Sequence, residues 1–175
     1  MFKIYVYVLD TLADWELGYV IAELNSGRFF KKDAPCVSVK TVSFSKEPVK
    51  TMGGLTIVPD CLIDDIAVSE TSVLLLPGAN TWNDPKHSAI IEKAGELLSV
   101  EATVCAICGA TVADNNLITA GPTGALLWAR QIIEHLGVFQ SNTLESWYEY
   151  FRTGEPQHFF ALMQTLSSDN EKTYG

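Results

Sequence analysis

At 175 residues the chain has the length of one domain, able to bury about 70% of the surface that its unfolded form exposes, so disulfide bonds are not needed for a core. With 47% hydrophobic and 19% charged residues, its composition is typical of globular proteins. The net charge of −9 argues against a nucleic-acid partner, because nucleic acids are bound by Lys and Arg side chains that neutralise phosphates. Residues 167–175, "SSDNEKTYG", are expected to form a disordered tail.

Residues 2–9 are almost all apolar and rich in aromatic and β-branched types, which predicts a parallel strand covered on both faces. The same run does not read as a signal peptide, because Asp10 ends it and no small-residue cleavage site follows. No run approaches the roughly 18 apolar residues that a membrane span needs. Since the four cysteines also lack the spacing of a disulfide framework, we expect a cytoplasmic protein with no membrane partner.

A helix is predicted next, over residues 14–25, with an apolar stripe and Gly27 placed to end it. Residues 36–44 alternate like a second strand, and "MGGLTIVPD" (52–60) predicts a hairpin at the sheet edge. The run "PDCLIDDI" (59–66) is expected to be a short helix.

The most strongly buried strand is expected over residues 72–80, ending in a Pro-Gly turn. Asp84 should cap a helix that has Pro85 at its first position and runs to about Leu98.

Further strands are expected in "ATVCAIC" (102–108) and "NNLITAG" (115–121). One helix is expected from Thr123 to a stop at Gly137, and another begins at Asn142 or Thr143, with Gly154 just past its end. Strands that alternate with helices of 10 to 15 residues indicate an α/β fold, a doubly wound and mostly parallel sheet sandwiched by helices. We therefore predict a single domain over residues 1–175.

Chemistry-bearing residues follow three of the predicted strands, at the carboxyl edge where such sheets bind ligands. They are Asp14-Trp15-Glu16, Pro77-Gly78-Ala79-Asn80 and Cys108-Gly109. The run "AICGA" has the form of a nucleophile elbow, in which small neighbours permit a tight turn that exposes the side chain. A thiol at such a turn is acidified by backbone amides, and the thiolate is the reactive form. The alternative is a buried core cysteine.

The chain resembles the ThiJ/PfpI family, within the class I glutamine-amidotransferase-like superfamily. The resemblance rests on "DTLADWELG", "LLLPGANTW", "VCAICGAT" and "NNLITAGPTGALLWARQIIEHLGV", in that order. It implies that Cys108 is the elbow cysteine and that Glu16 lies against its sulfur, where a protonated carboxyl can donate a hydrogen bond. It also implies that the backbone amides of Ala79 and Gly109 form an oxyanion site. For Glu16 the alternative is an exposed helix residue.

Two positions depart from the family's protease-like branch. Gly109 stands where that branch has a His directly after the cysteine, and Ala13 stands where it has a further glutamate. A Cys-His peptidase dyad is therefore absent at position 109. A third departure concerns length: compared with the family, about 35 residues of helical crossover are missing near 109–114, although parallel strands need a connection of a dozen or more residues.

Two explanations are open for the short connection. Either the protein is truly shortened, or a disordered segment has been omitted from the sequence and numbered through. We favour omission, because deleting a crossover would leave the core of the sheet uncovered. Consecutive Cα atoms across a trans peptide lie about 3.8 Å apart, so a wider spacing between Cys108 and Asp114 would reveal a gap.

Other candidates are weaker. Cys105 and Cys108 have C-x-x-C spacing, but Cys105 falls within a strand, which disfavours a redox pair. His87, His135 and His158 have no metal-ligand spacing, so we expect no metal and no cofactor. Two positions are open for His87: it approaches the site from the loop "NTWNDPKH", or it lies on the surface, which we favour. Thr123 is expected to cap the following helix.

Two functions are carried forward. The first is a cysteine-dependent hydrolase, of the kind described as intracellular protease or amidase, acting on a small carbonyl or amide substrate. The second is a non-catalytic, oxidative-stress-sensing protein whose Cys108 is oxidised. A homodimer is expected, because many relatives are dimers and the run of Trp147, Tyr150 and Phe151 suits helix packing or a subunit interface.

Overall fold

The computed structural model describes residues 1–107 and 116–171. Six parallel strands form a sheet in the order β5-β2-β1-β6-β7-β8. The strands are β1 (Phe2–Tyr7), β2 (Val37–Ser43), β5 (Cys61–Leu62), β6 (Ser72–Leu76), β7 (Thr103–Ile107) and β8 (Leu117–Ala120). A separate antiparallel hairpin pairs β3 (Val49–Lys50) with β4 (Thr56–Ile57), as the Gly-Gly turn predicts.

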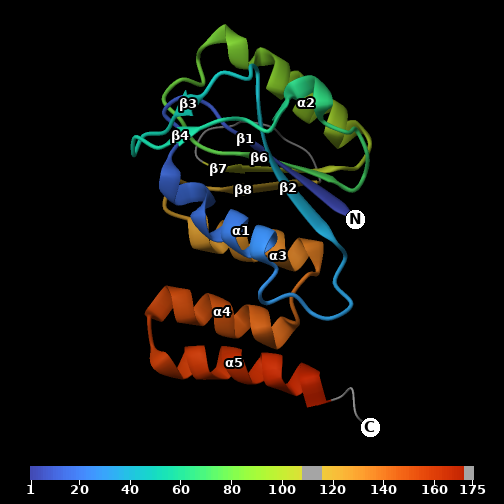
Figure 1. Ribbon diagram of the computed structural model, residues 1–175, viewed down its shortest axis with the longest axis vertical. Helices are drawn as coiled ribbons and strands as arrows, with labels where there is room; N and C mark the ends of the chain where they lie inside the picture. Colours follow the sequence, from blue (N-terminus) through green and yellow to red (C-terminus); the bar gives the residue numbers. More distant parts are fainter. Residues whose placement is uncertain (108–115, 172–175) are drawn as a thin grey trace.

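Helices cover both faces of the sheet (Figure 1). One face carries α2 (Ser88–Ser99), and the other carries α1 (Asp14–Ser26) and α3 (Ala125–Leu136). Beyond α3 lie α4 (Ser141–Thr153) and α5 (Pro156–Glu171), which form a further layer. The predicted doubly wound α/β sandwich is therefore confirmed.

The chain reverses its direction of travel across the sheet between β1 and β6. From β1 it moves outward to β2 and β5, and from β6 it moves outward the other way to β7 and β8. Such a switch point leaves a crevice at the carboxyl ends of its two strands, which is where ligands bind in this architecture. The residues that follow β1 and β6 are therefore the first to consider as a site.

Several boundaries differ from the expectations. Residues 59–66 are not a short helix, because Cys61 pairs with Val42 of β2 and only η1 (Ile63–Asp65) turns as a 3-10 helix. Thr123 does not cap α3, since Gly124 holds the N-cap position without a side-chain hydrogen bond. Residues 167–171 belong to α5 instead of a disordered tail, and residues 172–175 lie outside the described part.

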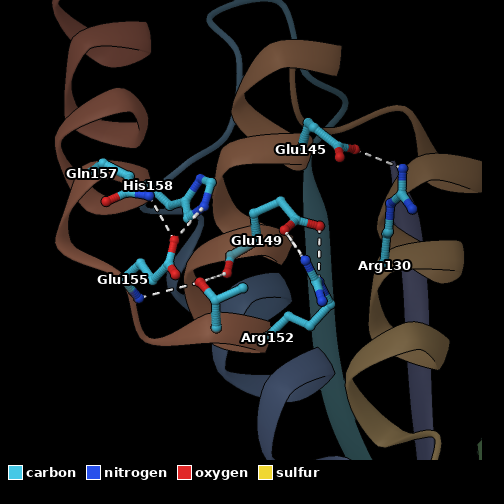
Figure 2. Close-up of polar contacts among 8 residues, drawn as sticks. Arg130, Glu145, Glu149, Arg152, Glu155, Gln157 and His158 are labelled. Atoms are coloured by element: carbon cyan, nitrogen blue, oxygen red, sulfur yellow. Dashed lines mark hydrogen bonds and ion pairs between the residues drawn. The ribbon is translucent and has the colours of Figure 1, made fainter.

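Buried side chains join the outer helices to the rest of the fold, and one surface charge pair links α4 to α3. Trp147 and Leu144 of α4 and Leu162 of α5 are buried, so this layer has apolar contacts with the rest of the core. Figure 2 shows the polar contacts, in which Arg130 of α3 donates to Glu145 of α4 at 2.8 Å and Arg152 pairs with Glu149. Exposed pairs of this kind contribute little stability, so the packing of Trp147 matters more.

Candidate functional site

Glu16 lies in the first turn of α1 and is fully buried, with 0% of its surface exposed. Its Oε2 accepts a hydrogen bond from the backbone N–H of Gly78, at 2.6 Å. The alternative that Glu16 is an exposed helix residue is therefore wrong. An acidic side chain near a helix N-terminus is also favoured by the helix dipole. The carboxyl group thus sits at the switch point, between the loops that follow β1 and β6.

The loop that follows β6 is fixed against residues 11–13, which lead into α1, by three contacts. Ala13 N–H donates to the carbonyl of Gly78 at 2.9 Å, and Leu12 forms a β-bridge with Ala79. The N–H of Asn80 donates to the hydroxyl of Thr11 at 3.0 Å. Thr11 has φ of 64°, a strained conformation for a β-branched residue, and such strain is concentrated at functional sites.

Ala79 lies between the loop residues that make the hydrogen bonds of these contacts. Ala79 is half-buried, and its N–H donates no hydrogen bond within residues 1–107 and 116–171. An amide held in place by the neighbouring contacts, but not itself used, is suited to receive a developing negative charge. Cys108 and Gly109, the other two predicted site residues, lie outside the described residues, as does the spacing test between Cys108 and Asp114.

The hairpin docks on the first residue of α1. Asp14 Oδ2 accepts the backbone N–H of Gly53 at 2.6 Å, and a Cβ at position 53 would lie only 2.9 Å from the same oxygen. Glycine is therefore required for this approach. The hydrogen bond from the Thr51 side chain, and then that from Gly53 N–H, lower the pKa of Asp14. The carboxylate stays ionised and holds the hairpin tip next to the site.

A second polar cluster lies behind the loop, and sequence reasoning missed it. Tyr7 Oη and His87 Nδ1 are 2.7 Å apart, and Trp82 packs against both rings while donating its indole N–H to the carbonyl of Pro77 at 2.9 Å. His87 is 1% exposed, so the expected surface position is wrong. The sequence held one signal for this cluster. Tyr7 ends a strand predicted to be buried, and a buried Tyr hydroxyl usually has a hydrogen-bond partner.

Burial controls the ionisation of this cluster. It lowers the pKa of His87, with a smaller effect of the same sign from Lys86 and opposing effects from Asp84 and Asp10. Burial, assisted by Asp84, raises the pKa of Tyr7 well above its ordinary value. Both side chains are therefore neutral near pH 7.

The remaining candidates lie away from the site. Cys105 is fully buried in β7, and burial strongly raises the pKa of its thiol, which argues against a redox pair. His135 contacts the hydroxyl of Thr103 at the opposite end of β7, and His158 lies beside Glu155 on α5. Within the described ranges no group of three or more potential metal ligands occurs, and no helix there is long and apolar enough to cross a bilayer.

A family model and a relative of known sequence match most of this chain. The model of the DJ-1/PfpI family matches residues 2–113. A Bacillus subtilis (strain 168) protein named "Uncharacterized protease YoaZ" is 37% identical over 205 residues, covering 94% of this chain and 98% of the relative. Because 94% of 175 residues is about 165, about 40 of the 205 aligned positions are present only in the relative.

Solved structures share the fold. A thiJ/pfpI family protein from Bacillus anthracis superposes with a TM-score of 0.88 at 36% identity, covering 93% of this chain and 95% of that one. A DJ-1 superfamily protein, Atu0886 from Agrobacterium tumefaciens, gives 0.71 at 19% identity, covering 86% and 97%. Toxoplasma gondii DJ-1, solved in an oxidized form, gives 0.60 at 16% identity, covering 95% and 98%. The chain therefore belongs to the DJ-1/PfpI family.

Proposed function

We propose that this chain is a cysteine-dependent hydrolase that acts on a small carbonyl or amide compound. Cys108 is the nucleophile, Glu16 exchanges the proton, and the backbone amides of Ala79 and Gly109 hold the oxyanion. The observation that carries the proposal is the position of Glu16, fully buried and bonded to Gly78 at the switch point of the sheet.

The strand register supports the pairing of Glu16 with Cys108. Leu76 of β6 pairs with Ala106 of β7. In the sequence, Gly78 lies two residues after Leu76, and Cys108 lies two residues after Ala106. A carboxyl group that contacts position 78 is thus suited to reach position 108. The free amide of Ala79 supplies the donor that an oxyanion needs.

The proposed reaction on an amide has two stages. The Cys108 thiol gives its proton to Glu16 as the sulfur attacks the carbonyl carbon, and the carbonyl oxygen becomes an oxyanion held by the amides. When the carbon–nitrogen bond breaks, Glu16 returns the proton to the leaving amine and a thioester remains. Water then attacks the thioester, and the acid and the free thiol are released. The overall change is amide and water to acid and amine.

No histidine of the described part bonds to Glu16 or to the loop at residues 77–79. The proposal therefore does not include a Cys-His peptidase dyad, and it favours small substrates over folded proteins.

The test is turnover of a panel of small amides, esters and glyoxals by the wild-type chain and by Cys108→Ser. Cys36→Ser is the matched control, because Cys36 is an exposed free thiol directly before β2, at the amino edge of the sheet. We expect turnover by the wild type and by Cys36→Ser, and loss of at least about 100-fold in Cys108→Ser. Equal turnover by Cys108→Ser would refute the nucleophile assignment.

The alternative function is a stress sensor, in which hydrogen peroxide oxidises the Cys108 thiolate to a sulfenate and releases water. A solved structure of similar fold, Toxoplasma gondii DJ-1, is described as oxidized, which supports this alternative. Peptide mass spectrometry after mild peroxide separates the two ideas. Selective oxidation of Cys108 without turnover of any compound in the panel would favour the sensor.

We also propose that the protein is located in the cytoplasm and forms a homodimer. Free thiols at Cys36, Cys61 and Cys105 suit a reducing compartment. The hairpin and α1 expose apolar side chains, with Trp15 55% and Leu55 64% exposed, and such surfaces are typical of protein interfaces. We expect light scattering to give the mass of two chains for the wild type and of one chain for Leu55→Asp. A wild-type monomer at 100 μM would contradict this.

A further inference from the structure

A hollow of about 290 Å³ lies on the sheet surface between β1 and β2, away from the site described above. Its wall includes Lys3 and Tyr5 of β1 and Ser38 and Lys40 of β2. Asp65 and Ala67, which follow β5, also line it. Because these strands are parallel, a hollow beside residues 3–5 lies toward the opposite end of β1 from the loop that leads to Glu16.

The strand register brings the polar side chains of the wall together. Lys3 pairs with Ser38 and Tyr5 pairs with Lys40. Paired residues of adjacent strands project from the same face of a sheet, and so do residues two apart on one strand. The four side chains therefore form a square on one face. Tyr7 projects from this face as well, toward His87, which identifies it as the face that carries α2.

The wall has hydrogen-bond donors without acceptors. Tyr5 is 5% exposed, and its hydroxyl oxygen accepts the N–H of Ala67 at 3.1 Å, while its own O–H has no acceptor within the described residues. The hydroxyl of Ser38 has no partner there either. Both hydroxyls are therefore able to donate a hydrogen bond to a ligand in the hollow.

The charges of the wall favour an anion. Lys3 and Lys40 form no ion pair with any described residue. Asp65 contributes one negative charge, and its Oδ2 is occupied by the N–H of Leu62 at 2.8 Å. Two cations against one anion give the hollow a local positive charge on a chain whose net charge is −9. Ammonium and hydroxyl donors together bind oxyanions.

We propose that this hollow is a binding site for a small molecule bearing an oxyanion group, a phosphate or a carboxylate. Lys3 and Lys40 hold the charge, and the hydroxyls of Tyr5 and Ser38 donate to the oxygens. Asp65 favours ligands that also carry a hydroxyl group, which can donate to its second oxygen. The site is independent of Cys108, so its ligand is a second molecule and not the substrate of the proposed hydrolase.

The test is a nuclear magnetic resonance titration of the ¹⁵N-labelled full chain with inorganic phosphate and, separately, with citrate, at constant ionic strength. We expect the backbone amides of Lys3, Ser38 and Lys40 to shift and saturate with at least one of the two anions. Saturation with phosphate alone supports a phosphate ligand, and saturation with citrate alone supports a carboxylate ligand. Shifts that stay linear with both anions up to 20 mM would overturn the proposal.

Three variants make the result specific. Ser38→Ala removes a hydroxyl that has no partner in the described chain, so it should fold normally and bind at least about threefold more weakly. Lys3→Gln with Lys40→Gln should weaken binding at least about tenfold. The control, Lys50→Gln with Lys93→Gln, removes the same charge elsewhere and should leave the affinity within about twofold. An equal loss in the control would show general electrostatic attraction and overturn the site.

Discussion

Two acidic side chains of α1 are buried, and each is held by its own donors. Glu16 accepts from Gly78 at the switch point, and Glu23, 2% exposed, accepts from Arg28 and from the indole of Trp147. Burial of a carboxylate costs free energy unless hydrogen bonds compensate for the lost hydration, and both side chains have such bonds. We assign Glu16 to the proposed chemistry and Glu23 to the attachment of α4.

The buried side chain of His87 makes the free energy of unfolding depend on pH. Burial lowers its pKa in the folded state from 6.5, so the unfolded chain takes up a proton at a higher pH than the folded chain does. Stability is therefore full above pH 6.5 and is lost as the pH falls below it, with a slope of at most about 1.4 kcal/mol per pH unit. Urea unfolding at pH 7.5 and 5.5 should show a smaller loss for His87→Gln than for the wild type.

The matched control for His87 is His158→Gln. His158 is partly exposed beside Glu155, so its replacement should leave the wild-type pH dependence in place. If His87→Gln loses as much stability on acidification as the wild type, the buried imidazole is not the group that titrates.

Single buried residues could be predicted from the sequence where they belong to a motif. Glu16 was selected through the family motif, and its burial is confirmed. Glu23 was missed, although it lies seven residues from Glu16 and so on the same face of the helix. Trp15 is apolar but 55% exposed, because the buried face of this helix consists of Glu16, Leu17, Val20, Glu23 and Leu24.

At the element scale, the contact between α1 and α4 depends on Glu23. Arg28 Nε donates to its Oε2 at 2.9 Å, Arg28 Nη2 donates to its Oε1, and Trp147 Nε1 donates to the same Oε1 at 3.0 Å. In Arg28→Ala the buried carboxylate of Glu23 loses the two hydrogen bonds from Arg28 and keeps the one from Trp147. We expect a loss of about 1–3 kcal/mol in the free energy of unfolding, measured by urea denaturation.

Arg152→Ala is the control for Arg28→Ala. The two arginine side chains are equally exposed, at 52%, but the partner of Arg152 is Glu149, which is 22% exposed against 2% for Glu23. The unfolding midpoint should therefore move much less in Arg152→Ala. Equal shifts in the two variants would mean that the burial of Glu23 does not determine the effect.

The elements themselves were largely predictable from sequence, and the exceptions have physical causes. The cap residues Gly27, Gly137 and Gly154 all adopt positive φ, as expected for helix ends. The helix α5 was not predicted, although Pro156 at its first position was a usable signal. The run at 59–66 was misassigned because pairing of Cys61 with β2, a long-range contact, overrides its local helical pattern.

For the whole molecule, the connection from β7 to β8 is the unusual feature. The strands are parallel neighbours, yet only residues 108–116 separate them, fewer than the dozen or more of a usual crossover. The outer strand β8 is incompletely covered, with Thr119 exposed and Leu117 half-buried. Sequence comparison within the family could identify this shortfall, but composition and periodicity could not.

The central claim is that Glu16 activates the thiol of Cys108. The most direct measurement is the rate of Cys108 alkylation by iodoacetamide between pH 5 and 10, followed by peptide mass spectrometry, in the wild type, Glu16→Leu and Glu23→Gln. Glu23→Gln removes a buried acid from the same face of α1 without touching the site, so it controls for altered folding. We expect half-maximal alkylation below about pH 8 for the wild type and Glu23→Gln, and a rate at pH 7 at least about tenfold lower in Glu16→Leu. Identical profiles in the wild type and Glu16→Leu would contradict it.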